Sequence, residues 1–201
     1  MLTLYHAPQS RSSRIVWLLE ELEAPYELRI MHIPRTLEAT GKPDPSNPHP
    51  DKKVPALLDD GALITESAAI SLYLTDKFPA NGIGPMVGDA LRGPYVSWLA
   101  YNAGVIEPVM AMKFAELEDN PVLRLTFRGR GEVDARILGA LNAGPYLLGE
   151  RFSAVDVLIG SGGMWMRQLL PDGKVVDDYI ARLAARPALA RANAKDGEIP
   201  K

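Results

Sequence analysis

The chain has no cysteine among its 201 residues, and this absence excludes several kinds of chemistry. Without cysteine it can form no disulfide, no thiolate metal site and no cysteine nucleophile. Histidine is scarce too, and the spacing of His6, His32 and His49 is not that of metal ligands. No metal site is therefore expected, and any reaction at a thiol requires a ligand that brings the thiol.

Excess charge and long apolar runs are also missing. The formal net charge of −3 and the sequence pI near 5.7 give no general attraction to nucleic acid or to an anionic membrane, so neither is an expected partner. No apolar run approaches the length that spans a bilayer. The first residues lack the charged-then-apolar pattern of a secretory signal, which makes the cytoplasm the expected location.

One stretch, KKVPALLDDGALITESAAISLYL at positions 52–74, predicts a β-hairpin followed by a helix. A short apolar run follows Pro55, and the turn at Asp59–Gly61 returns the chain as an antiparallel strand. Thr65 is a favourable N-cap, and Glu66 then places a carboxylate in the first turn of the helix.

Two features of this stretch suggest a binding site. Pro55 cannot donate a ladder hydrogen bond, and a cis Val54–Pro55 bond would leave the backbone of Val54 free for an extended, peptide-like ligand. The free N–H groups of Glu66 and Ser67 at the start of the helix suit a carboxylate, and the Ser67 hydroxyl adds a donor. The alternative is a hairpin and helix that bind nothing.

The first part of the chain, residues 1–78, predicts an α/β thioredoxin-like domain. A strand at the N-terminus, a helix over 10–22 and a strand over 26–30 form a βαβ unit, in which Glu20, Glu21 and Glu23 are expected to face solvent. An irregular stretch from Pro34 to Pro50 precedes the hairpin and helix, so the order is βαβ, then ββα.

The second part predicts an all-α domain over 88–201, after a linker over 79–87 that is rich in proline and glycine. Helices are expected over 90–118 with a kink near Pro108, over 121–141 with an interruption at Gly129 and Gly131, from Ser153, over 178–185 and over 187–194. Ser153 and Asp156 have the spacing of a capping box, which is a folding signal.

Three motifs in this order resemble the cytosolic glutathione S-transferase family: KVPAL, TESAAISLYL and the S-x-x-D of the later helix. The resemblance covers nearly the whole chain and implies the same two domains, glutathione as co-substrate without a bound cofactor, and a homodimer. It implies that Val54, Pro55, Glu66 and Ser67 hold the backbone and the γ-glutamyl end of glutathione. Lys53 would contact the glycyl carboxylate, unless it is a solvated lysine.

The resemblance also implies a group that stabilises the glutathione thiolate. The segment SRSSR is similar to the bacterial-type, serine-using branch, whose spacing selects Ser10, with Ser12 as the second candidate. Tyr5 is similar to the tyrosine of another branch, and Arg11 can act by charge. The alternative for the serines is ordinary helix capping.

The expected function is conjugation of glutathione to a small apolar electrophile held between the domains. Side chains for that pocket lie on the first long helix: Tyr95, Trp98, Tyr101 and Asn102. An aromatic stripe at helical spacing is also typical of a core. Two other functions remain open, a glutathione-dependent peroxidase or reductase and a non-catalytic glutathione-binding or interaction protein of the same fold.

Overall fold

The computed structural model describes residues 1–34 and 44–197, so the middle of the expected irregular stretch at 34–50 lies outside the described residues. The chain divides into two compact units, and each is described by itself. The first comprises Met1–Phe78 together with Arg186–Lys201, and the second comprises Pro79–Ala185. The last helix therefore belongs to the first unit, whereas the sequence placed all of 88–201 in the second domain.

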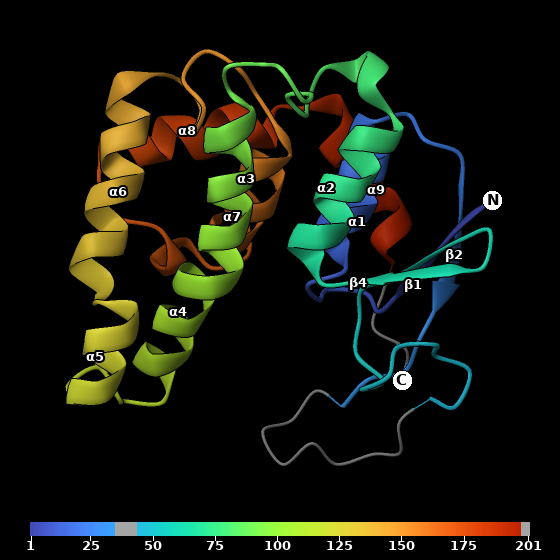
Figure 1. Ribbon diagram of the computed structural model, residues 1–201, viewed down its shortest axis with the longest axis horizontal. Coiled ribbons are helices and arrows are strands. Elements are labelled where there is room, and N and C mark those ends of the chain that lie inside the picture. The colour runs from blue at the N-terminus through green and yellow to red at the C-terminus, as the bar shows by residue number, and fades with distance from the viewer. Residues whose placement is uncertain (35–43, 198–201) are drawn as a thin grey trace. The chain divides into compact units, whose positions relative to one another are not determined.

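The first unit is built on a four-stranded sheet with the order β2-β1-β3-β4 (Figure 1). Its strands are β1 (Leu2–His6), β2 (Tyr26–Ile30), β3 (Ala56–Asp59) and β4 (Ala62–Thr65). β1 pairs in parallel with β2 and antiparallel with β3, which forms a hairpin with β4. All five residues of β1 are buried because this strand has a neighbour on each side.

The helices α1 (Ser13–Glu21) and α2 (Ser67–Lys77) lie on the same side of this sheet (Figure 1). They complete the predicted βαβ–ββα arrangement, which is confirmed. The predicted N-cap of α2 is wrong: Thr65 is the last residue of β4, and Glu66 is the N-cap. Helix α1 begins at Ser13, three residues later than expected, because the preceding serines belong to a hydrogen-bonded turn.

Helix α9 (Pro187–Asp196) packs along α1 and explains why two expected surface residues are buried. The side chains of Glu20 and Glu21 are only 7% exposed, so the expectation that they face solvent is wrong. Arg186 makes a two-pronged ion pair with Glu21, at 2.6 and 2.8 Å, and the Lys195 ammonium donates to Glu20. Burial alone would raise the pKa of Glu20, but hydrogen bonds from Lys195, Tyr26 and Arg191 outweigh it and lower that pKa.

In the second unit the described residues form helices without a strand, which confirms the predicted all-α region. Its elements are η1 (Pro79–Asn81), α3 (Arg92–Tyr101), the π-helical η2 (Asn102–Ile106), α4 (Glu107–Phe114), α5 (Pro121–Phe127), α6 (Arg130–Ala143), α7 (Ala154–Trp165), η3 (Arg167–Leu169) and α8 (Lys174–Ala184). Where the sequence predicts a kink near Pro108, the α-helical pattern is interrupted by the π-helical η2, which ends two residues before that proline. Across the described residues no helix is both long and apolar enough to cross a membrane.

The capping box of α7 is present and buried. Asp156 accepts from the backbone N–H of Ser153 at 2.8 Å, and the Ser153 hydroxyl accepts from the N–H of Val155 at 3.2 Å. The same carboxylate also accepts from the N–H of Leu147 at 2.9 Å and from the hydroxyl of Tyr179 at 3.2 Å. Burial raises the pKa of Asp156 to about 6, although these hydrogen bonds oppose the rise.

Candidate functional site

The strand register brings three sequence-predicted segments to one end of the sheet. Tyr5 of β1 lies opposite Ala56 of β3, which in turn lies opposite Thr65 of β4. Beyond this row the chain leaves β1 into the serine turn, enters β3 through Val54 and Pro55, and leaves β4 into Glu66. The serine turn and the Val54–Pro55 segment, more than 40 residues apart along the chain, therefore meet with Glu66 at the same end of the sheet.

The Val54–Pro55 peptide bond is cis, as the sequence hypothesis required. Pro55 is buried, whereas Val54 is half-buried and packs against a small cluster that contains Tyr5, Met31 and Ala56. Val54 lies one residue before the buried Pro55 and outside β3, at the start of the strand. This is the position in which its backbone can pair with an extended ligand.

Glu66 and Ser67 form the start of α2, with Glu66 as N-cap and Ser67 as the first helical residue. Glu66 has φ +68°, a value that favours glycine, and its carboxylate is exposed. A non-glycine residue in this conformation is typical of a functional position. Ser67 is half-buried, and the N–H groups of the first turn have no partner within the helix.

The two adjacent lysines have different surroundings. The Lys52 ammonium donates to the carbonyl of Asn47 at 2.7 Å, so it is engaged within the loop. Lys53 is exposed, and no carboxylate of residues 1–34 or 44–197 pairs with its ammonium. Of the two, Lys53 has the ammonium that a ligand carboxylate can reach.

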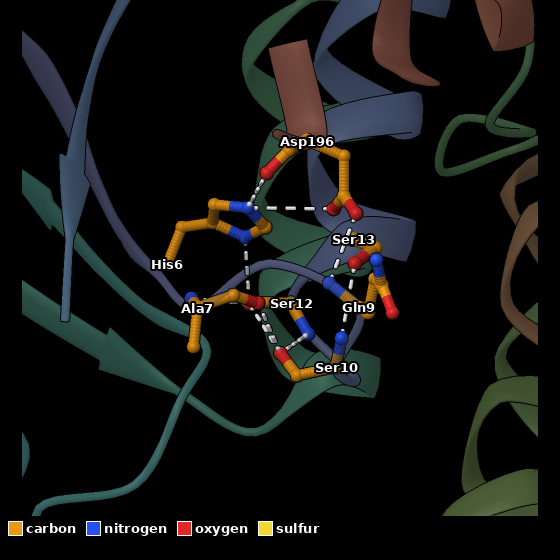
Figure 2. A network of polar contacts seen from close by, with 7 residues as sticks. All are labelled: His6, Ala7, Gln9, Ser10, Ser12, Ser13 and Asp196. Atoms are coloured by element: carbon orange, nitrogen blue, oxygen red, sulfur yellow. Dashed lines mark hydrogen bonds and ion pairs between the residues drawn. The ribbon is translucent and has the colours of Figure 1, made fainter. Parts of the chain in front are cut away.

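The serine turn between β1 and α1 contains a compact hydrogen-bond network (Figure 2). The Ser10 hydroxyl donates to the carbonyl of Ala7 at 2.7 Å and lies 2.7 Å from the Ser12 hydroxyl. It also accepts from the backbone N–H of Ser12 at 3.1 Å. Ser12 has no exposed surface, whereas Ser10 is half-buried. Ser10 is therefore the hydroxyl of this pair that a ligand can contact.

Ordinary helix capping does not account for Ser12. It occupies the N-cap position of α1, but its side chain makes no capping hydrogen bond. Instead its hydroxyl accepts from the backbone N–H of Ala7 at 3.0 Å and lies 2.8 Å from Nδ1 of His6. The other two candidates are Tyr5, which is 7% exposed within β1, and Arg11, which is exposed in the turn.

Sequence reasoning missed two members of this network, His6 and Asp196. The His6 ring has no exposed surface, and its Nε2 lies 3.2 Å from the backbone carbonyl and 3.3 Å from Oδ1 of Asp196. The same carboxylate accepts from the backbone N–H of Gln9 at 2.9 Å, so the end of α9 supports the serine turn (Figure 2). A single histidine and a distant aspartate carry no spacing signal that could have revealed this contact.

The residues expected for the second substrate lie along α3, from Tyr95 to Tyr101, and at the first position of η2, Asn102. The rings of Trp98 and Tyr101 meet edge to face with centroids 5.8 Å apart, and the guanidinium of Arg136 in α6 stacks over both. Tyr95 has no exposed surface and Asn102 is 4% exposed, which are environments of core residues. Tyr101, the half-buried member, presents the most surface to a ligand.

These features define a class of protein. Its first unit is thioredoxin-like and gathers a strand entered through a cis-proline, the start of a helix and a serine turn at one end of its sheet. Its second unit, later in the sequence, is all-α. Residues 1–76 match the family model described as glutathione S-transferase, N-terminal domain. The chain is 40% identical over 108 residues to glutathione S-transferase 3 of Schizosaccharomyces pombe, a match that covers 54% of this chain but only 43% of that protein. It is 28% identical over 155 residues to glutathione S-transferase GstA of Escherichia coli O157:H7, covering 74% of this chain and 76% of the relative.

Solved structures agree with these matches. A glutathione S-transferase of Actinobacillus pleuropneumoniae is similar with a TM-score of 0.81 and 26% identity, over 98% of this chain and 93% of the other. A sphingomonad glutathione S-transferase, solved in complex with glutathione, is similar with a TM-score of 0.76 and 25% identity, over 97% and 98% of the two chains. Residues 1–76 thus match the N-terminal domain of glutathione S-transferases, and nearly the whole chain is similar to glutathione S-transferases, bacterial ones among them.

Proposed function

We propose that the protein conjugates reduced glutathione to a small apolar electrophile, with the thiolate stabilised by the Ser10 hydroxyl. The observation that supports this most strongly is the register that gathers the serine turn, Val54–Pro55 and Glu66–Ser67 at one sheet edge. In this arrangement Val54 pairs with the peptide backbone of glutathione, while Glu66 and Ser67 bind its γ-glutamyl end. Lys53 binds the glycyl carboxylate.

The chemistry requires only one hydroxyl donor near the sulfur. A free thiol has a pKa of about 8.5, and the thiolate is the reactive form. A hydrogen bond to a charged group contributes about 1.5–3 kcal/mol, which lowers a pKa by roughly one to two units. The nearby start of α1 favours the thiolate as well. Trp98 and Tyr101 are the proposed apolar contacts of the electrophile, and the homodimer and the cytoplasmic location stay predictions.

The test combines binding with turnover. We expect the protein to be retained on immobilised glutathione, to lower the pKa of bound thiol by at least about one unit, and to conjugate an aryl halide or a similar electrophile. The thiolate absorbance, followed as a function of pH, measures the pKa. Binding without any shift and without conjugation would identify a glutathione-binding protein without transferase activity. A lowered pKa with reduction of a peroxide in place of conjugation would favour the peroxidase function.

The variant Glu66→Gln tests the γ-glutamyl contact. We expect the Kd for glutathione to rise about 10-fold, because the variant loses the charge that pairs with the ligand's ammonium. The kcat at saturating glutathione should change little, since in the proposed arrangement Glu66 binds the γ-glutamyl end and does not contact the sulfur. Calorimetric titration gives the Kd, and Glu118→Gln, an exposed glutamate of the second unit, is the control. An unchanged Kd in Glu66→Gln would show that Glu66 does not bind the ligand.

A further inference from the structure

A thiol that becomes a thiolate must give its proton to some acceptor, and the serine turn leads to one. We propose that His6 accepts the thiol proton of glutathione through a relay of two hydroxyls, Ser10 and then Ser12, while Asp196 stabilises the resulting imidazolium. This inference rests on the proposed function. His6 does not touch the ligand in this scheme and acts as a positioning residue behind the hydroxyl that does.

The two nitrogens of the His6 ring have different hydrogen-bond roles, because one must donate and the other accepts. Nε2 lies 3.2 Å from the carbonyl oxygen and 3.3 Å from Oδ1 of Asp196, and both of these atoms can only accept. Nε2 therefore carries a hydrogen. In the neutral ring the other nitrogen, Nδ1, is then an acceptor, and the Ser12 hydroxyl lies 2.8 Å from it. The ring is thus set to receive a proton from Ser12.

The Ser12 hydroxyl has one proton and several neighbours. Its oxygen accepts from the N–H of Ala7 at 3.0 Å, and its proton can reach either Nδ1 of His6 at 2.8 Å or the carbonyl of Ala7 at 3.2 Å. The shorter contact is the one to His6. The Ser10 hydroxyl has a similar choice, because its one proton can go to the carbonyl of Ala7 at 2.7 Å or to the Ser12 hydroxyl at 2.7 Å.

The Ser10 hydroxyl connects this buried pair to the ligand. It lies 2.7 Å from the Ser12 hydroxyl, and either oxygen can be the donor. When Ser10 donates to Ser12 and Ser12 donates to His6, the Ser10 oxygen has a lone pair left for the thiol S–H. The three groups then form a continuous path from a bound thiol to Nδ1.

The relay conserves every atom and involves no change of oxidation state. The S–H bond breaks as an O–H bond forms on Ser10; the former Ser10 proton moves to Ser12, and the former Ser12 proton moves to Nδ1. Glutathione becomes a thiolate, His6 becomes an imidazolium, and both serines remain neutral. Ser10 now carries the proton that came from the sulfur, so it is the donor that stabilises the thiolate.

Asp196 is placed to compensate the new charge. Its Oδ1 is buried, accepts no hydrogen bond from the described residues and lies 3.3 Å from Nε2 of His6. The basic residues of the same helix that lie near this end, Arg191 and Lys195, are engaged with Glu20 of α1. A carboxylate behind a histidine that faces a serine is also the arrangement by which serine hydrolases stabilise an imidazolium.

The experiment compares thiolate formation with proton release. Glutathione is bound to the full protein near pH 7 in weak buffer; ultraviolet absorbance measures the thiolate, and an indicator dye measures the protons released to solution. We expect clearly less than one proton released per thiolate, because the proton stays on His6. In ¹⁵N NMR, one of the three histidines should change from the Nε2–H tautomer to the imidazolium on binding.

Two variants interrupt the relay at different points. His6→Asn retains an amide oxygen that accepts from Ser12 but cannot take a proton, and Ser12→Ala removes the connecting hydroxyl. In both we expect about one proton released per thiolate formed and a smaller fraction of thiolate at the same pH. The exposed His32→Gln is the control and should behave as the parent does. A purely structural role of His6 would weaken binding without changing the number of protons per thiolate.

The outcomes separate the relay from the proposed function. A parent that forms thiolate and releases one proton for each would overturn the relay and leave the transferase proposal intact. A parent that binds glutathione without forming thiolate would overturn both. If His6→Asn does not fold, the parent stoichiometry and the NMR titration still decide, because neither needs a variant.

Discussion

Replacing Ser10 with alanine should lower kcat/KM for glutathione conjugation about 10- to 150-fold, the loss expected when one hydrogen bond to a charged group disappears. Ser10 has the partly exposed hydroxyl of the turn, whereas Ser12 is fully buried. The bound-thiol pKa should return toward about 8.5, and the rate at high pH should recover partly as the thiolate forms without help. Initial rates measured from pH 6 to 9 check both expectations.

The controls for this variant lie within the chain. Ser161→Ala removes a hydroxyl that donates to the carbonyl of Leu158 at 3.0 Å inside α7, and it should leave the pH profile unchanged. If Ser10→Ala keeps its rate and its thiol pKa, the donor is another group. An equal loss in Ser12→Ala alone would then assign the role to Ser12, and retention in both would move it to Arg11 or Tyr5.

Replacing Asp156 with alanine should lower the free energy of unfolding by about 3–5 kcal/mol. The carboxylate is the acceptor for four buried donors, the N–H groups of Ser153 and Leu147 and the hydroxyls of Ser153 and Tyr179. Each buried donor that loses its acceptor destabilises the folded state by about 1–3 kcal/mol. The variant no longer buries a carboxylate, and this gain offsets part of the total loss. Urea unfolding followed by circular dichroism measures the change.

Helix α6 provides a matched control. Glu132 accepts from the backbone N–H of Gly129 at 3.1 Å in the same N3-to-N-cap arrangement, but at an exposed site. Glu132→Ala should cost at most about 1 kcal/mol, because water replaces the lost acceptor. Equal losses in the two variants would show that burial of Asp156 does not govern its contribution.

The pH dependence of stability gives Asp156 a distinct signature. Its pKa is about 6 in the folded protein and near the ordinary value of 3.8 when unfolded, so the folded state binds more protons between these values. The stability that this group contributes is present at low pH and is lost as the pH rises through about 6. From pH 7 to pH 5 the parent should gain roughly 1 to 1.5 kcal/mol relative to Asp156→Asn, which does not titrate. A difference that stays constant with pH would contradict the raised pKa.

Local signals in the sequence predicted the elements well. Proline, glycine and the S-x-x-D motif act within a few residues, so the hairpin, the capping box and the break before Pro108 could be located from the sequence. Thr65 shows the limit of this reasoning: pairing with Ala56 keeps it in β4, and the cap moves to Glu66. At this position the hydrogen bonds between β3 and β4 outweigh the preference of threonine for the N-cap of a helix.

Contacts between distant segments could not be predicted in the same way. The sequence pattern placed Glu20 and Glu21 on the solvent face of an amphipathic helix. The cations that pair with them, Arg186 and Lys195, lie 165 to 175 residues further along the chain and leave no local signal. The His6–Asp196 contact, 190 residues apart, was missed for the same reason. Sequence patterns report on residues that are close along the chain, whereas these partners come into contact only after the chain has folded.

The packing of α9 on α1 also affects the order in which the two units can fold during synthesis. Residues 1–78 are synthesised more than a hundred residues before Arg186, and in that interval Glu20 and Glu21 lack the cations that pair with them in the finished protein. The all-α unit, which is continuous in sequence, can fold as it emerges. We therefore expect the nascent chain to acquire a protease-resistant helical unit first, while the first unit, with its four-stranded sheet, matures only after the last helix has been synthesised.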